Sequence, residues 1–135
     1  MDATITSYLP SLGKFTSLED ATLESRQLAS LIVDTIADHL GEDIVLLDIS
    51  DVSILADFFV IATAGSDRQL RTLAEEVRKT ANAGGRRVRV EGDVQSGWVL
   101  VDHGDVITHL FSSEKRQLYR LEDAWSQARV VVRVQ

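Results

Sequence analysis

Apolar residues recur every three or four positions in two stretches of the chain, which is the spacing of an amphipathic helix. The first stretch leads up to Leu40, and its stripe consists of Leu28, Leu31, Ile32, Ile36 and Leu40. Ser17, with Asp20 three residues later, resembles a capping signal, and Gly41 is well placed to end the helix. These residues predict one long helix between about residue 17 and Leu40.

The second stretch follows the sequence Gly65-Ser66-Asp67. Ser66 is the natural N-cap there, and the carboxylate of Asp67 is favourable beside the positive end of the helix dipole. The apolar stripe of this helix is formed by Leu70, Leu73, Ala74, Val77 and Ala81. Gly84 and Gly85 are expected to end it.

Five other segments predict strands. Residues 44–49 (IVLLDI) and 58–63 (FFVIAT) are almost continuously apolar, as is typical of strands buried on both faces. Residues 87–91 (RVRVE) alternate strictly, which predicts a half-exposed strand near a sheet edge. Residues 98–101 and 106–111 are two further strands. The order of elements predicts a single α/β domain with flanking helices and a mixed five-stranded sheet.

The last two strands are expected to form a hairpin. A two-residue turn at His103 and Gly104 would pair Asp102 with Asp105 and would require positive φ at Gly104. Alternation then places side chains on two faces. One face holds Trp98, Leu100, Asp102, Asp105, Ile107, His109 and Phe111, and the other holds Val99, Val101, Val106, Thr108 and Leu110.

Both faces of this hairpin are rich in apolar groups, and two helices can cover only one of them. Either the C-terminal segments fold over the second face, or it stays partly exposed and meets a partner. Trp98 is accordingly either a core residue or the centre of an interface fringed by Asp102, His103 and Asp105.

The ends of the chain carry weaker signals. Residues 1–16 hold the proline Pro10 and no periodicity, which indicates a flexible leader. Residues 113–121 and 122–127 predict short helices, and an apolar VVVRV segment follows. We expect three regions: a leader at 1–16, a domain at 17–127 and a C-terminal tail at 128–135.

Composition narrows the functional classes. The net charge of -7 has the wrong sign for non-specific nucleic-acid binding, although it suits a basic protein partner as well as simple solubility. The chain has no cysteine, which excludes disulfides, thiolate metal sites and thiol nucleophiles. It has neither an apolar run of membrane-spanning length nor an export signal, so we expect a cytoplasmic protein.

The candidate chemistry is sparse, and we predict that the chain is not an enzyme and has no metal or cofactor. Ser66 and Asp67 sit at a strand-to-helix junction of the kind used by nucleotidyltransferases, or by helix N-termini that bind phosphate. Two-metal transfer needs a second carboxylate nearby, and no acid follows Asp67 until Glu75. His39, His103 and His109 do not form a metal spacing.

Three segments resemble the ribosomal silencing factor family, also called Iojap-like. They are DIVLLDISDVSILADFFVIATAGSDRQLRTLAEEV, VEGDVQSGWVLVDHGDVITHLF and RQLYRLEDAW, and together they span roughly residues 24–127. The resemblance implies a nucleotidyltransferase-like fold without the catalytic acids. It also implies binding to the fourteenth protein of the large ribosomal subunit at the intersubunit face. A protein there would block joining of the small subunit and repress translation when nutrients are short, and members are often homodimers when free.

The family's motif positions correspond here to Asp57, Ser66, Asp67 and Arg68, and to Trp98, Leu100, Asp102, Gly104, Asp105 and His109. We place the contact with the ribosome on the hairpin, and the predicted partner-binding residues are Trp98, Leu100, Asp102, His103, Asp105, Ile107 and His109. Two alternatives stay open at this point. They are a nucleotidyltransferase-like nucleotide-binding protein and a generic dimerisation module.

Overall fold

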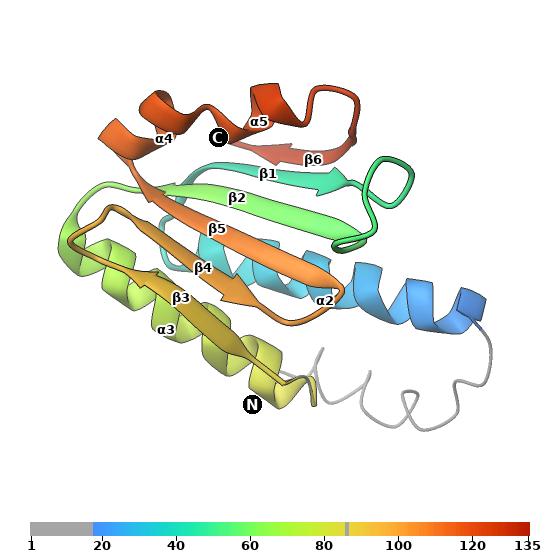
Figure 1. Cartoon of the computed structure of the whole chain (residues 1–135). Helices are drawn as coiled ribbons and strands as arrows, with labels where there is room; N and C mark the ends of the chain where they lie inside the picture. Colours follow the sequence, from blue (N-terminus) through green and yellow to red (C-terminus); the bar gives the residue numbers. More distant parts are fainter. Residues whose placement is uncertain (1–17, 86) are drawn as a thin grey trace.

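Six strands form one mixed sheet in the computed structural model, which describes residues 18–85 and 87–135, with side chains from residue 24 onward (Figure 1). The strand order is β3-β4-β5-β2-β1-β6; β2 and β5 are parallel and all other neighbours are antiparallel. The strands are β1 (Glu42–Asp48), β2 (Phe58–Ala64), β3 (Arg89–Asp93), β4 (Trp98–Asp102), β5 (Val106–Ser112) and β6 (Arg129–Val134).

Two long helices, α2 (Leu18–Asp38) and α3 (Asp67–Ala83), lie against one face of this sheet (Figure 1). We call it the helix face. Their apolar stripes pack onto the inward residues of the strands, and the resulting main core includes Leu28, Ile32, Ile36, Leu46, Val60, Leu70, Leu73 and Leu110. Burial of these stripes supplies the chief force that holds the helices to the sheet.

The opposite face of the sheet, which we call the second face, carries a smaller core over β1 and β2. Two short helices, α4 (Ser113–Tyr119) and α5 (Leu121–Ala124), follow β5 on this side. The buried members of the smaller core are Val45, Leu47, Ile49, Ala56, Phe59, Ile61 and Phe111. Leu121, Trp125 and Ala128 pack against them from the C-terminal segment. All seven residues of β2 are buried because they lie between the two cores.

The predicted single α/β domain with a mixed sheet is confirmed, but the predicted number of five strands is wrong. The sixth strand comes from the apolar VVVRV segment, which pairs with β1 along the edge of the sheet. At one end of this pairing, Arg129 of β6 forms an ion pair of 2.7 Å with Asp48 of β1. The predicted edge strand is β3, whose five residues are all exposed.

The hairpin register also differs from the prediction. Asp102 pairs with Ile107 and not with Asp105, and three residues, 103–105, separate β4 from β5 where a two-residue turn was expected. The shift is an even number of positions, and the predicted face of every paired residue is therefore retained. Gly104 has the expected positive φ of 86°.

The helix boundaries follow the capping signals closely. Ser66 is the N-cap of α3, where its hydroxyl accepts a hydrogen bond from the amide of Gln69, and Gly84 is its C-cap. After α2 the positive φ falls on Leu40 and not on Gly41. Gly41 is needed for a different reason, because a Cβ there would overlap the side chain of Ile36. The predicted cap Ser17 and the predicted leader lie outside the described residues.

Candidate functional site

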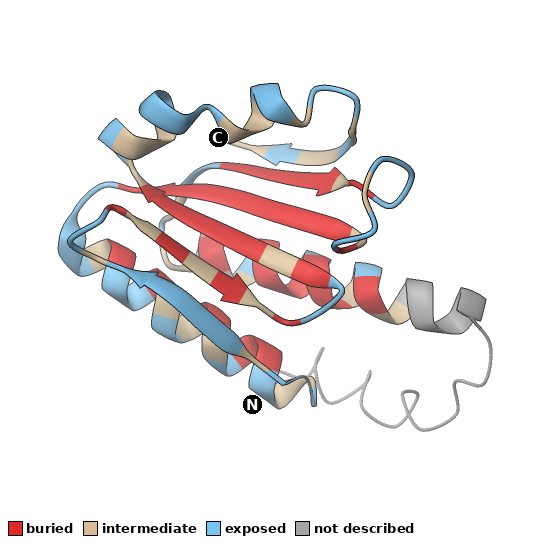
Figure 2. Cartoon of the chain, viewed as in Figure 1, coloured by how far each residue is buried: buried red, intermediate tan, exposed pale blue. Residues whose placement is uncertain are grey.

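The C-terminal segment covers only part of the second face, and β4 with the start of β5 remains partly exposed there. Trp98, Leu100 and Ile107 point to this side and are neither buried nor fully exposed. Figure 2 shows β4 alternating between buried and intermediate positions, whereas β5 is mostly buried. The alternate residues Val99, Val101 and Leu110 are buried on the helix face. The C-terminal segment therefore covers one part of the second face, as one alternative predicted, and another part stays partly exposed; contact with a partner there stays a prediction.

Trp98 lies within a cluster of aromatic rings. Its centroid is 5.0 Å from that of Phe111, its cross-strand neighbour, and 4.8 Å from that of Tyr119 on α4. Tilted aromatic pairs at such separations are favourable beyond the area that they bury. Part of the indole surface is thus covered by Phe111 and Tyr119, and the rest is accessible to a partner.

His109 lies at the N–H edge of the indole and is only 5% exposed. Its Nδ1 accepts a hydrogen bond of 3.2 Å from Nε1 of Trp98. Burial lowers the pKa of His109 to about 4, so the ring is neutral near pH 7. Because an indole N–H can only donate, the proton of the neutral imidazole must lie on Nε2. His109 therefore orients Trp98 and is not itself part of the open surface.

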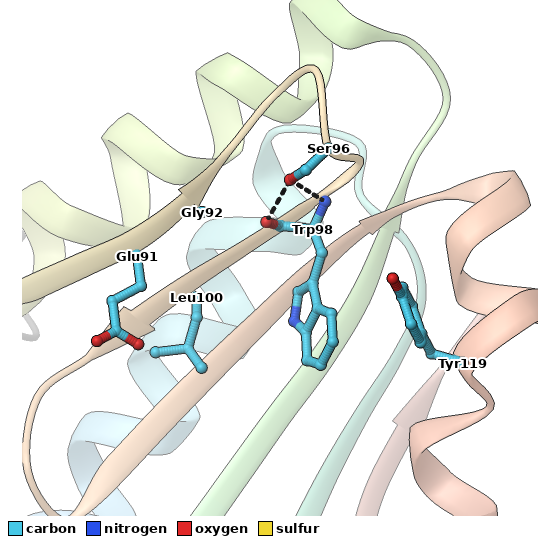
Figure 3. Close-up of a pocket in the computed structure, with 6 residues that line it drawn as sticks. All are labelled: Glu91, Gly92, Ser96, Trp98, Leu100 and Tyr119. Atoms are coloured by element: carbon cyan, nitrogen blue, oxygen red, sulfur yellow. Dashed lines mark hydrogen bonds between the residues drawn. The ribbon is translucent and has the colours of Figure 1, made fainter.

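A trough of about 290 Å³ opens beside the indole (Figure 3). It is lined by Glu91, Gly92, Ser96, Trp98, Leu100 and Tyr119. Tyr119 forms one wall, and the carboxylate of Glu91, on β3, lies beside Leu100 on the other side. The floor is apolar, and one rim carries the carboxylate of Glu91, which pairs with the exposed guanidinium of Arg89 at 2.9 Å. The arrangement suits an apolar group of another molecule, or a cationic one that replaces Arg89.

The position of Tyr119 depends on how α4 is attached to the sheet. Ser112 caps the helix by accepting a hydrogen bond from the amide of Lys115. Arg116 is largely buried, donates from Nη1 to Thr63 in β2 at 2.8 Å, and donates from Nε and Nη2 to Glu122 at 3.0 and 2.9 Å. Burial would raise the pKa of Glu122, but these hydrogen bonds outweigh it and hold the pKa below its ordinary value.

Tyr119 and Glu91 are residues of the trough that the sequence did not single out. The short helix predicted after the hairpin contains Tyr119, but nothing in its spacing shows that the helix folds back onto Trp98. The alternation of residues 87–91 placed Glu91 on an edge strand, and its cross-strand partner is Leu100. That pairing could have pointed to Glu91 once the strand order was known.

The other predicted residues of the hairpin lie at its turn. Asp102 is partly exposed, and its carboxylate accepts a hydrogen bond of 2.8 Å from the amide of Gly104. His103 is buried and contacts the hydroxyl of Thr108 at 3.3 Å, on the helix face. The carboxylate of Asp105 accepts a hydrogen bond of 3.0 Å from Ser25 of α2. His103 and Asp105 are therefore not gathered with Trp98, contrary to the predicted grouping of Asp105 with it.

The first block of motif residues is divided between the two ends of β2. Asp57 precedes this strand, and Ser66, Asp67 and Arg68 follow it at the start of α3. Ser66 acts as a cap, and the side chain of Gln69 joins this end of α3 to the carbonyls of His39 and Leu40. These residues do not converge on one point.

The described part of the chain contains no group of three or more His, Asp or Glu side chains that could hold a metal ion. Asp67 is exposed in the first turn of α3, with no second carboxylate in that turn. The arrangement that the fold does build, an open aromatic trough with an acidic rim, is suited to binding a surface and not to bond chemistry.

The fold and the trough define a small α/β domain with a partly open apolar surface. A family model described as "Ribosomal silencing factor during starvation" matches residues 22–135. The chain belongs to this family, as the resemblance of its sequence blocks predicted. The family is not one of enzymes, which confirms the prediction that the chain is not an enzyme.

Several relatives share most of the domain. The chain is 36% identical over 110 residues to the ribosomal silencing factor of Halalkalibacterium halodurans, covering 81% of this chain and 94% of the relative. It is 40% identical over 92 residues to that of Bacillus subtilis, covering 67% and 78%. A crystal structure of a Chromobacterium violaceum protein superposes with a TM-score of 0.72 at 32% identity, covering 75% of this chain and 85% of that one.

In the described part of the chain, no helix combines the length and the apolar character that a membrane span requires.

Proposed function

We propose that this protein binds the large ribosomal subunit through the half-open part of its second face. The observation that carries the proposal is the trough between Trp98 and Tyr119. An oriented indole with an open edge, an apolar floor and a carboxylate on the rim have the composition of an interface hot spot. Membership of the ribosomal silencing factor family supports the ribosome as the partner.

The charge of the chain supports a protein as the direct contact on that subunit. With a net charge of -7, the domain is attracted to basic ribosomal proteins and repelled by the phosphates of ribosomal RNA. Within the resemblance to the family, we assign the contact to the fourteenth protein of the large subunit. The partner then supplies cationic and apolar groups to the trough, and Glu91 meets the cationic ones.

The mechanism that we propose is steric. A folded domain held at the intersubunit face of the large subunit occupies space that the small subunit needs, and joining of the subunits is blocked. No chemical step or cofactor is required. The repression acts in the cytoplasm when nutrients are limiting, and its extent depends on how much of the large subunit the protein occupies.

The same surface is expected to affect the free protein. An aromatic trough open to water is unfavourable, and we propose that two copies cover it mutually as a homodimer in the absence of ribosomes. Binding to the large subunit would then compete with dimerisation. Sedimentation of the free protein, with and without large subunits, distinguishes this arrangement from a monomer.

The test of the proposed function is pelleting of the protein with purified subunits, comparing wild type with Trp98→Ala. We expect wild type to pellet with large subunits and the variant to stay in the supernatant. Wild-type pelleting that is unaffected by Trp98→Ala would remove the trough from the contact. Wild type that fails to pellet with large subunits would end the proposal.

A further inference from the structure

The loop between β1 and β2, residues 49–57, exposes three large apolar side chains to solvent. Ile54 is fully exposed at 104%, Leu55 is 68% exposed and Val52 is 43% exposed. Single exposed apolar residues are common on protein surfaces, but three within four positions form a local patch. Nothing in the fold requires them to be apolar, because they contribute little to either core.

The loop is held in a defined conformation. Asp48 accepts hydrogen bonds from the hydroxyl and the amide of Ser50, at 2.6 and 3.0 Å. The amides of Val52 and Ser53 donate to the carbonyl of Ile49, at 3.0 and 2.9 Å. The apolar side chains are thus presented on a bonded turn, so a partner would lose little binding energy in ordering them.

The loop is also continuous with the half-open part of the second face. Ala56 packs into the smaller core of this face, against which Ile107 and Trp98 also pack. The amides of Asp57 and Phe58 both donate to the carbonyl of Asp105, at 2.8 and 3.1 Å, which fixes the loop to the start of β5.

The exposed patch and the trough therefore lie at opposite ends of one open strip of the second face, which is formed by the partly exposed Trp98, Leu100, Asp102 and Ile107. Trp98 pairs with Phe111, six residues along β5 from Asp105, which corresponds to a distance of about 20 Å. An ordinary protein interface of about 800 Å² per partner is wider than this. One partner surface can therefore contact both ends at once.

We infer that Val52, Ile54 and Leu55 form a second apolar anchor, which inserts into an apolar depression on the same protein that occupies the Trp98 trough. The inference rests on the proposed function and adds a second point of contact to it. Two anchors about 20 Å apart fix the orientation of the domain on its partner, which a single trough cannot do. A fixed orientation is what a steric block of subunit joining requires.

The test compares the double variant Ile54→Ser/Leu55→Ser with Leu40→Asn in large-subunit binding. Leu40 is a matched control because it is 77% exposed but precedes β1, at the other end of that strand from the loop. Asn also tolerates its positive φ of 65°. We expect the double variant to melt like wild type and to bind large subunits about tenfold or more weakly. Leu40→Asn should bind as wild type does.

Two results would overturn the inference and leave the proposed function standing. One is unchanged binding of the double variant when Trp98→Ala abolishes binding. The other is weaker self-association of the double variant at unchanged subunit affinity, which would make the patch a contact between copies. If both the double variant and Trp98→Ala bind large subunits as wild type does, the proposed function itself is contradicted.

A photo-crosslinking amino acid at position 54 gives a second readout that does not depend on affinity. We expect it to crosslink to one large-subunit protein, the same one that is captured from position 119. Capture of a different protein, or of ribosomal RNA, would show that the loop is not an anchor for the partner of the trough.

Discussion

The indole nitrogen of Trp98 donates a hydrogen bond to Nδ1 of His109, a buried and neutral imidazole on the neighbouring strand, across 3.2 Å. This bond sets the orientation of the aromatic group at the centre of the open trough. It also makes a buried titratable group part of the fold, and the stability of the domain consequently depends on pH.

The pH dependence has a defined sign. The pKa of His109 is about 4 in the folded protein and about 6.5 in the unfolded chain, so the unfolded chain binds more protons between these values. The free energy of unfolding should therefore fall as pH drops from about 6.5 to 4, by at most about 3 kcal/mol. In His109→Asn, which keeps an acceptor for the indole, this part of the loss should be absent. Denaturant unfolding of both proteins at pH 7, 5.5 and 4.5 measures this difference. If the free energy of unfolding falls equally with pH in both proteins, His109 is not the group responsible.

Removal of the indole should affect binding more than folding. Because Trp98 is half-buried, Trp98→Ala should cost less stability than the about 3–5 kcal/mol of a fully buried aromatic residue. It should weaken large-subunit binding by about 2 kcal/mol or more, roughly thirtyfold. Trp125→Ala is the matched control, because Trp125 is also half-buried but contacts Phe59 in the smaller core, at a centroid distance of 5.0 Å. Trp125→Ala should melt at a lower temperature than wild type and still bind large subunits. If instead Trp98→Ala lowers the melting temperature and leaves binding unchanged, Trp98 is a core residue.

Two glycines with nearly the same φ allow the close packing at the trough to be tested. Gly92 has φ of 78°, and a Cβ there would overlap the carbonyl oxygen of Trp98; Gly85 has φ of 80° and open space around it. Gly85→Ala should cost about 1 kcal/mol of stability, from the backbone conformation alone. Gly92→Ala should cost clearly more, about 3 kcal/mol, because β3 must also move away from β4. If thermal melts show equal losses of stability for the two variants, the close approach of Gly92 to the carbonyl of Trp98 contributes nothing to stability.

The hydrophobic pattern was sufficient to predict most of this architecture. The stripes of α2 and α3, the cap at Ser66 and the two faces of the hairpin follow from local spacing, which the fold preserves. The strand β6 was missed because it forms only by pairing with β1, which lies far away in the sequence: Asp48 and Arg129, paired across the two strands, are 81 positions apart. The hairpin loop was predicted too short because the Asp102 carboxylate binds the amide of Gly104, a local bond that the apolar pattern does not record.

The site was predicted less completely than the fold. Alternation correctly placed Trp98, Leu100, Ile107 and His109 on one side, but it could not show that His109 is buried at the edge of the indole. Tyr119 is held at the trough in part by Arg116, which joins α4 to Thr63, 53 residues earlier in the chain. Contacts of that range depend on the packed fold and leave no periodic signal in the sequence. The role of each of these residues in partner binding stays a prediction.

The absence of catalysis can be checked directly on the residue that most resembles a catalytic acid. Asp67 is exposed in the first turn of α3, with no second carboxylate in that turn to share a metal ion. We expect no nucleotide transfer from any nucleoside triphosphate with magnesium or manganese. Turnover that disappears in Asp67→Ala would contradict the conclusion that the chain is not an enzyme.

The central claim is that the open strip of the second face binds the large ribosomal subunit. Its most direct test is sedimentation of the wild-type protein through sucrose with purified large subunits, purified small subunits and a mixture of both. We predict that the protein pellets with large subunits, stays behind with small ones and reduces the yield of joined ribosomes in the mixture. Equal association with both subunits, or with neither, would contradict the account.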